Sequence, residues 1–128
     1  MSEYLSSQEL HQLTGYVLRP DAAAHRVGDY PGGGVYMLFS KDGRLLYVGQ
    51  SLDIGYRVLQ HLWAVRRKER QPFVEFTAVD VPDELMRHVE CAHIHALSPP
   101  ENTLPRVEWA HHEQMVELIR TAWEKANG

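Results

Sequence analysis

The sequence predicts an α+β fold, in which a small three-stranded antiparallel sheet is flanked by helices. Residues 35–40 and 45–49 are rich in residues that favour strands, and Asp42-Gly43 between them favours the tight turn of a β-hairpin. Residues 72–79, rich in Phe and Val, predict a third strand. Apolar residues spaced three and four apart around these strands predict helices that pack against the sheet.

Four helices are predicted, each from an apolar face and from capping or helix-stopping residues at its ends. Their predicted starts are Ser6, Ser51 or Asp53, Pro82 and about Glu108. The third helix stops at Pro99-Pro100, because proline cannot continue a helix. The fourth extends to about Lys125, and residues 15–33 are rich in turn-forming residues.

Length and composition favour one globular domain covering residues 1–128. A chain of 128 residues with 44% hydrophobic content can close a single core. No apolar run approaches the roughly 18 to 20 residues that a membrane span needs, so no membrane partner is expected. Cys91 is the only cysteine, which excludes an intrachain disulfide and favours a reducing compartment. We therefore expect a cytoplasmic protein.

The charge distribution permits, but does not require, a surface that faces phosphates. The net charge of −4 counts against indiscriminate binding to a polyanion. Between Lys41 and Arg70, however, seven basic residues stand against three acidic ones. The alternative is that the run from Arg66 to Arg70 is simply a solvated helix end.

The predicted hairpin carries two short motifs, Gly34-Val35-Tyr36 and Tyr47-Val48-Gly49, with ten residues between them. Together they resemble the signatures of the GIY-YIG nuclease family, each with Val in place of Ile. The resemblance continues through Arg57, Glu90 and Asn102, in the order and spacing of that family. It covers residues 34–102, and its specificity lies in five ordered elements rather than in one tripeptide.

The resemblance implies a metal-dependent endonuclease that hydrolyses phosphodiester bonds, with DNA as the expected substrate and RNA or branched DNA as alternatives. The family core would span about residues 33–103, with an N-terminal helical extension and a C-terminal helix. It implies one Mg²⁺ or Mn²⁺ held by Glu90, a hard carboxylate ligand of the kind that Mg²⁺ prefers. Two copies would be needed to cut both strands, so a dimer is one expected arrangement.

The expected catalytic residues lie in one cleft, and each has a different role in hydrolysis. They are Tyr36, Tyr47, Arg57, His61, Glu90 and Asn102. As the resemblance implies, the two tyrosines would contact the attacking water and the phosphate. Arg57 offers a permanently charged fork to the phosphate, and His61, placed as in restriction-enzyme-like members, is a candidate proton relay for Tyr36. Asn102 would orient the backbone or the helix end rather than react. The expected nucleic-acid-binding residues are Lys41, Arg44, Arg57, Arg66, Arg67 and Lys68.

Two other classes of function remain open on the sequence. One is a non-catalytic nucleic-acid or protein interaction module, in which the tyrosines would only pack across the hairpin. The other is a zinc-dependent interaction protein, suggested by eight histidines, although no cysteine pair completes a zinc site. We expect Cys91 and His95 to be exposed, because their helix positions lie away from the predicted apolar face, and His93 to be partly buried.

Overall fold

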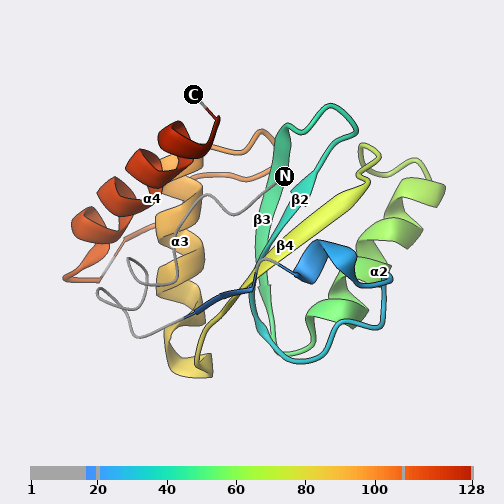
Figure 1. Cartoon of the computed structure of the whole chain (residues 1–128), viewed down its shortest axis with the longest axis horizontal. Helices are drawn as coiled ribbons and strands as arrows, with labels where there is room; N and C mark the ends of the chain where they lie inside the picture. Colours follow the sequence, from blue (N-terminus) through green and yellow to red (C-terminus); the bar gives the residue numbers. More distant parts are fainter. Residues whose placement is uncertain (1–16, 20, 108, 128) are drawn as a thin grey trace.

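The fold is a three-layer arrangement with a four-stranded antiparallel sheet in the middle (Figure 1). The computed structural model describes residues 17–19, 21–107 and 109–127, and the predicted N-terminal helix lies outside them. The strands are β1 (Val17–Arg19), β2 (Gly34–Phe39), β3 (Leu45–Ser51) and β4 (Glu75–Asp80), in the order β1-β4-β2-β3. No helix within the described residues is long and apolar enough to cross a membrane.

Three α-helices and two short 3₁₀ helices complete the described fold. The α-helices are α2 (Ile54–Arg66), α3 (Met86–Leu97) and α4 (His112–Asn127), and the 3₁₀ helices are η1 (Ala22–Ala24) and η2 (Asp83–Leu85). Helix α2 covers one face of the sheet, while α3 and α4 cover the other (Figure 1). The predicted α+β class, with an antiparallel sheet flanked by helices, is confirmed.

The sheet differs from the prediction at one edge. The three predicted strands form, and a fourth short strand, β1, pairs with β4 through Leu18 and Val79. Three residues are too few to show an alternating pattern, so only this long-range pairing defines β1. The strand β4 begins at Glu75 rather than at Pro72, which has no N–H to donate to a neighbouring strand.

The register of the central hairpin places the two motif tyrosines on one face of the sheet. Tyr36 lies opposite Gly49, and Leu38 lies opposite Tyr47. Since alternate residues of a strand point to the same face, Tyr36 and Tyr47 are diagonal neighbours. The register then shifts so that Phe39 pairs with Leu45, and this irregularity increases the local twist of the strands.

Two glycines of the hairpin motifs are required by close contacts. Gly34 has a φ of +146°, and a Cβ atom there would lie 2.1 Å from the carbonyl oxygen of Val79. A Cβ atom on Gly49 would lie 2.5 Å from the phenol end of Tyr36. Gly49 therefore leaves the space into which the Tyr36 ring extends.

Two apolar clusters hold the layers together, one on each side of the sheet. On the α2 side, Ile54 and Val58 pack against Leu38, Phe76 and their neighbours. The other cluster joins the opposite sheet face to buried residues of α3 and α4, among them Val35, Met37, Val48, Val89, Ala92, Met115 and Ile119. Because α3 contacts both the sheet and α4, it is covered on two sides.

The chain leaves α3 through a turn that returns it to the sheet. Ser98 ends the helix in the left-handed region, with a φ of +45°, and Pro99 follows. The N–H of Glu101 then donates to the carbonyl oxygen of Leu46 at 3.1 Å. This contact brings residues 99–102 against the outer edge of β3, next to the tyrosines.

Candidate active site

The candidate site begins with the two tyrosines of the hairpin. Tyr36 is fully buried, Tyr47 is half-buried, and their ring centroids lie 6.2 Å apart. The space left by Gly49 and the shared sheet face bring the two rings together. The structure thus places both phenols where the sequence predicted neighbours.

His61 connects α2 to both tyrosines. Its Nε2 atom lies 2.8 Å from the phenol oxygen of Tyr36, within hydrogen-bonding distance. Its ring centroid lies 5.0 Å from that of Tyr47. The periodicity of α2 explains the placement, since His61 lies one turn beyond Arg57, on the margin of the stripe that packs on the sheet.

Arg70 holds the other side of the His61 ring. Its Nη1 donates to Nδ1 of His61 at 2.8 Å, and its Nη2 forms an ion pair with Oε1 of Glu101 at 2.6 Å. The guanidinium also lies over the rings of Tyr47 and Phe73, at 5.8 and 5.2 Å. The Arg70 side chain is only 9% exposed, which corrects the interpretation of the basic run as a solvated helix end at this residue.

This contact fixes the protonation pattern of His61. A guanidinium can only donate, so Nδ1 must accept and the proton of the neutral ring stands on Nε2. The Nε2–H therefore donates to the oxygen of Tyr36. Burial, then the charges of Arg70 and Arg57, lower the pKa of His61 to about 4, so the ring is neutral at physiological pH.

Arg57 lies close to the phenol of Tyr36. Burial raises the pKa of Tyr36 well above its ordinary value and nearby Tyr47 adds to this, whereas Arg57 lowers that pKa by its charge. The Arg57 side chain is exposed, and its Nη1 donates to Oε1 of Gln60 at 3.0 Å. A solvent-facing guanidinium next to a buried phenol is accessible to a phosphate.

Glu90 approaches the same phenol from α3, across the edge strand β3. Its Oε1 accepts a hydrogen bond from Nε2 of Gln50 at 3.1 Å, and its charge contributes to the raised pKa of Tyr36. Burial raises the pKa of Glu90 itself. A half-buried carboxylate that is costly to ionise alone is stabilised by a cation, so Glu90 fits the expected Mg²⁺ or Mn²⁺ ligand.

Asn102 pairs with the outer edge of β3. Its Oδ1 accepts from the N–H of Val48 and its Nδ2 donates to the carbonyl oxygen of Val48, both at 2.9 Å. Both outward backbone groups of Val48 are thereby satisfied. This contact holds the second motif in place.

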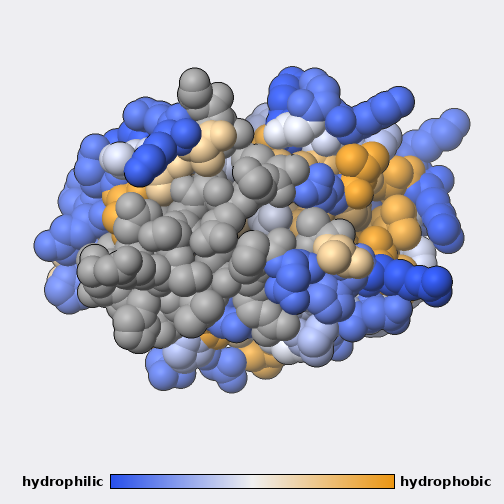
Figure 2. Space-filling model, in the orientation of Figure 1, coloured by the Kyte–Doolittle hydropathy of each residue, from blue (hydrophilic) through white to orange (hydrophobic). Residues whose placement is uncertain are grey.

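The residues expected to bind nucleic acid come from two segments and are all exposed. Lys41 and Arg44 belong to the β2–β3 turn. Arg57 and Arg66 belong to α2, and Arg67 and Lys68 directly follow it. Figure 2 shows hydrophilic side chains projecting over the turn and around α2. Arg44 pairs with Asp42 at 3.3 Å and Arg67 with Glu69 at 3.0 Å. Such exposed pairs are weak, so they leave these cations available to a phosphate backbone.

Three residues of the site were not predicted from the sequence, namely Gln50, Arg70 and Glu101. Gln50 directly follows the second motif and resembles the family's residue there, which was its signal in the sequence. Arg70 and Glu101 are 31 residues apart in the sequence, so no local pattern indicates that they form a pair.

Comparison with known families agrees with the motif resemblance. The family described as the GIY-YIG catalytic domain matches residues 32–109, which is more than half of the chain. The comparison with curated proteins and the comparison with solved structures each gave no match. The matched region contains the hairpin, α2, β4, α3 and the turn that carries Asn102. The chain belongs to the GIY-YIG family of nuclease-type catalytic domains.

Proposed function

We propose that this protein is a metal-dependent endonuclease that hydrolyses phosphodiester bonds, with DNA as its substrate. One arrangement carries the proposal: the phenol of Tyr36 is hydrogen-bonded to His61 while the charges of Arg57 and Glu90 both act on it. Hydrolysis of a phosphodiester needs a base for water and positive charge at the phosphate oxygens. The named side chains supply both at one place.

Tyr36 is the proposed base, and His61 is proposed to support it as a hydrogen-bond donor. The Nε2–H of His61 stabilises the negatively charged oxygen that forms when Tyr36 loses its proton. This differs from the relay expected from the sequence, in which His61 would accept the proton. The role of donor follows from the Arg70 contact on Nδ1.

Arg57 and Tyr47 are the proposed phosphate contacts. Arg57 is exposed and permanently charged, and its charge also favours the ionised form of Tyr36. Tyr47 is half-buried beside Tyr36, with a hydroxyl that can donate to a phosphate oxygen. Glu90 would hold one Mg²⁺ or Mn²⁺, whose positive charge stabilises the phosphate oxygens.

The exposed basic residues of the turn and of α2 are proposed to bind the nucleic-acid backbone, which makes binding salt-dependent. These residues are Lys41, Arg44, Arg57, Arg66, Arg67 and Lys68. RNA and branched DNA are the alternative substrates, and two copies would be needed to cut both strands of a duplex. The single cysteine suits the reducing cytoplasm, where we propose that the protein acts.

Nicking of supercoiled plasmid with Mg²⁺ or Mn²⁺ tests the proposal. We expect the variants Glu90→Gln, Tyr36→Phe and Arg57→Ala to lose about 100-fold or more in rate. Glu84→Gln is the matched control, because Glu84 is an exposed acid outside the site, and it should cut like the wild type. If wild-type protein binds DNA but nicks no faster than Glu90→Gln, the non-catalytic interaction module is the better description.

A further inference from the structure

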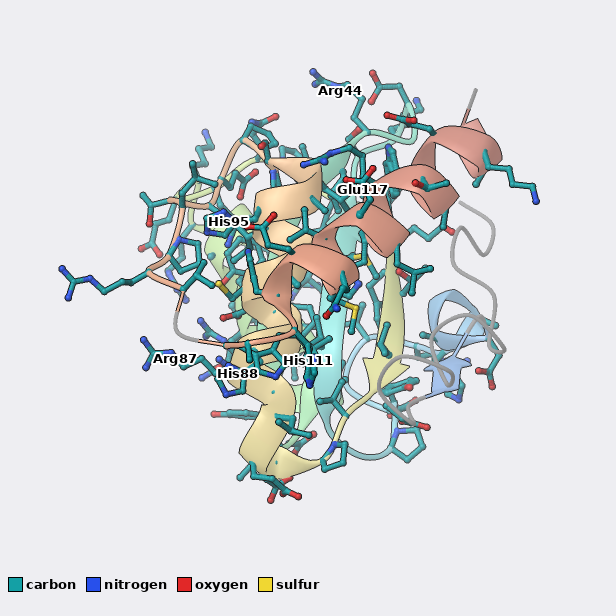
Figure 3. The ribbon with its side chains drawn as sticks, turned by 90° about the vertical axis from the view of Figure 1, so that its left-hand side faces the viewer. Arg44, Arg87, His88, His95, His111 and Glu117 are labelled. Carbon is teal, nitrogen blue, oxygen red and sulfur yellow. The ribbon has the colours of Figure 1, made fainter. Side chains whose placement is uncertain are left out.

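A second cluster of polar side chains lies on the far side of α3 from the sheet, near the start of α4. It consists of Cys91 and His95, one helical turn apart on α3, and His112, the first residue of α4. One ligand atom from each residue lies within 4.8 Å of the others. Figure 3 views the molecule from this side and labels His95, together with His88 and His111 nearby.

The two imidazole rings meet edge to face rather than stacking. Their ring centroids lie 4.9 Å apart with the planes at 90°. Nε2 of His95 lies 2.8 Å from the carbonyl oxygen of Pro105, to which it donates. The proton of a neutral His95 ring is then on Nε2, which leaves the Nδ1 lone pair available, an arrangement typical of metal-bound histidines.

His112 is the more deeply buried imidazole of the cluster. Its side chain is only 6% exposed, and within the described part of the chain its Nδ1 has no hydrogen-bond partner. A buried polar atom without a partner destabilises the folded protein, so most such atoms are paired. A cation at the centre of the cluster would satisfy it.

Cys91 is buried, with 6% of its surface exposed, which corrects the expectation that this residue is exposed. The expectation considered only the face of α3 that packs on the sheet, whereas the segment before α4 covers another face. The Sγ atom of Cys91 lies 3.8 Å from the carbonyl oxygen of Arg106, which is at most a weak contact. The thiol therefore has no strong partner that a metal would have to displace.

We propose that Cys91, His95 and His112 form a zinc site that joins α3, residues 105–106 and α4. A thiolate and two imidazoles are the soft and borderline ligands that Zn²⁺ binds, and they do not suit Mg²⁺. Binding releases the proton of the thiol, so the affinity falls as the pH is lowered. The site is separate from Glu90, whose side chain turns to Gln50 on β3.

A cavity of about 120 Å³ adjoins the cluster and leaves room for a fourth ligand. Besides Cys91 and His112, its walls include Arg87, His88, Arg106 and Trp109. Three protein ligands with an open fourth position allow a water molecule to complete a tetrahedral site. The ligands come from two helices and the backbone partners from the loop between them, so the metal holds α4 against the core.

Cobalt substitution tests the site in the full-length protein. Apo protein prepared with a chelator is titrated with Co²⁺, and we expect one equivalent to give a thiolate-to-cobalt charge-transfer band and the intense visible bands of a tetrahedral site. One equivalent of Zn²⁺ should abolish both. Cys91→Ser should lose the charge-transfer band, and His112→Gln should weaken binding at least 10-fold. The exposed neighbour His111 supplies the matched control, His111→Gln, which should bind like the wild type.

Two further measurements on wild-type protein keep the test decisive if a variant fails to fold. Zn²⁺ should slow alkylation of Cys91 at least 10-fold and raise the melting temperature by about 5 °C or more. The proposal is overturned if neither changes, or if Co²⁺ gives no charge-transfer band. Glu90→Gln should keep the cobalt bands, so failure of this site and failure of the proposed nuclease activity are distinguishable.

Discussion

Arg70 donates a hydrogen bond to Nδ1 of His61 at 2.8 Å, so the position of one proton in the site is set by a residue nine positions further along the chain. The guanidinium is held in turn by Glu101 at 2.6 Å. Neither residue belongs to the motifs that identify the family. The ring of His61 is thereby presented to Tyr36 as a donor, and the first two predictions depend on this.

Replacing Arg70 should change the tautomer of His61 and slow nicking. We expect Arg70→Gln to lower kcat about 10 to 100-fold with little change in KM, because substrate binding does not involve the buried guanidinium. Arg70→Lys should restore part of the rate, since an ammonium can still donate to Nδ1. Long-range ¹H–¹⁵N spectra report the tautomer directly. A His61 ring that keeps its proton on Nε2 in Arg70→Gln, at an unchanged rate, would contradict the positioning role.

The pH dependence of nicking should lack the inflection of an ordinary histidine. The pKa of His61 is lowered to about 4, so above about pH 5 the ring stays neutral and does not titrate. The pKa of Tyr36 is raised, so the fraction ionised, and with it kcat/KM, should rise through pH 6 to 9, roughly tenfold per unit. Rates measured at constant ionic strength check this. A rate that does not change between pH 6 and 9 would contradict Tyr36 as the base.

Protein stability should fall as the pH drops from about 6.5 to 4, partly because of His93. This side chain is fully buried, its Nδ1 lies 2.8 Å from the carbonyl oxygen of Val89, and burial lowers its pKa to about 4. As the pH falls, His93 is protonated in the unfolded chain before it is protonated in the folded protein. Its contribution to the free energy of unfolding is therefore fully present above pH 6.5 and is lost on acidification. The loss from His93 by pH 4.5 is about 2 to 3 kcal/mol.

Urea denaturation at several pH values measures that loss. His93→Leu should flatten the pH dependence of the free energy of unfolding over this range, whereas His111→Gln, at an exposed position, should leave it unchanged. Equal slopes for His93→Leu and wild type would mean that other groups, such as carboxylates, account for the acid sensitivity.

Gly49→Ala should inactivate the protein by displacing Tyr36. The added methyl group would lie 2.5 Å from the phenol end, so the ring must move away from His61. We expect nicking to fall about 100-fold, since small misplacements of catalytic groups have effects of this size. Gly43→Asn is the control, because the turn position is open and Asn tolerates its φ of +81°. Wild-type activity in Gly49→Ala would remove Tyr36 from the proposed mechanism.

The elements that the sequence predicts correctly are those with local signals. The hairpin carries its turn at Asp42-Gly43, and α2 is capped by Asp53, whose side chain accepts from the N–H of Tyr56 at 3.2 Å. The strand β1 has no such signal, because three residues become a strand only by pairing with β4.

The site residues missed by sequence analysis depend on long-range packing. In the basic run, Lys68 adopts a left-handed conformation with a φ of +59°, after which the chain turns and Arg70 points inward. Charge alone does not distinguish this arginine from its exposed neighbours. For Cys91, periodicity identified one buried face of α3, but the second face is buried by a segment whose position no local pattern reveals.

The pairing of Asn102 with Val48 also bears on how two subunits could associate. An exposed edge strand invites a second chain to extend the sheet, but here a side-chain amide already occupies the outward N–H and C=O of Val48, and Glu101 occupies the carbonyl of Leu46. Strand addition is therefore blocked at this margin. A symmetric assembly that cuts opposite strands must therefore form through surfaces other than this margin.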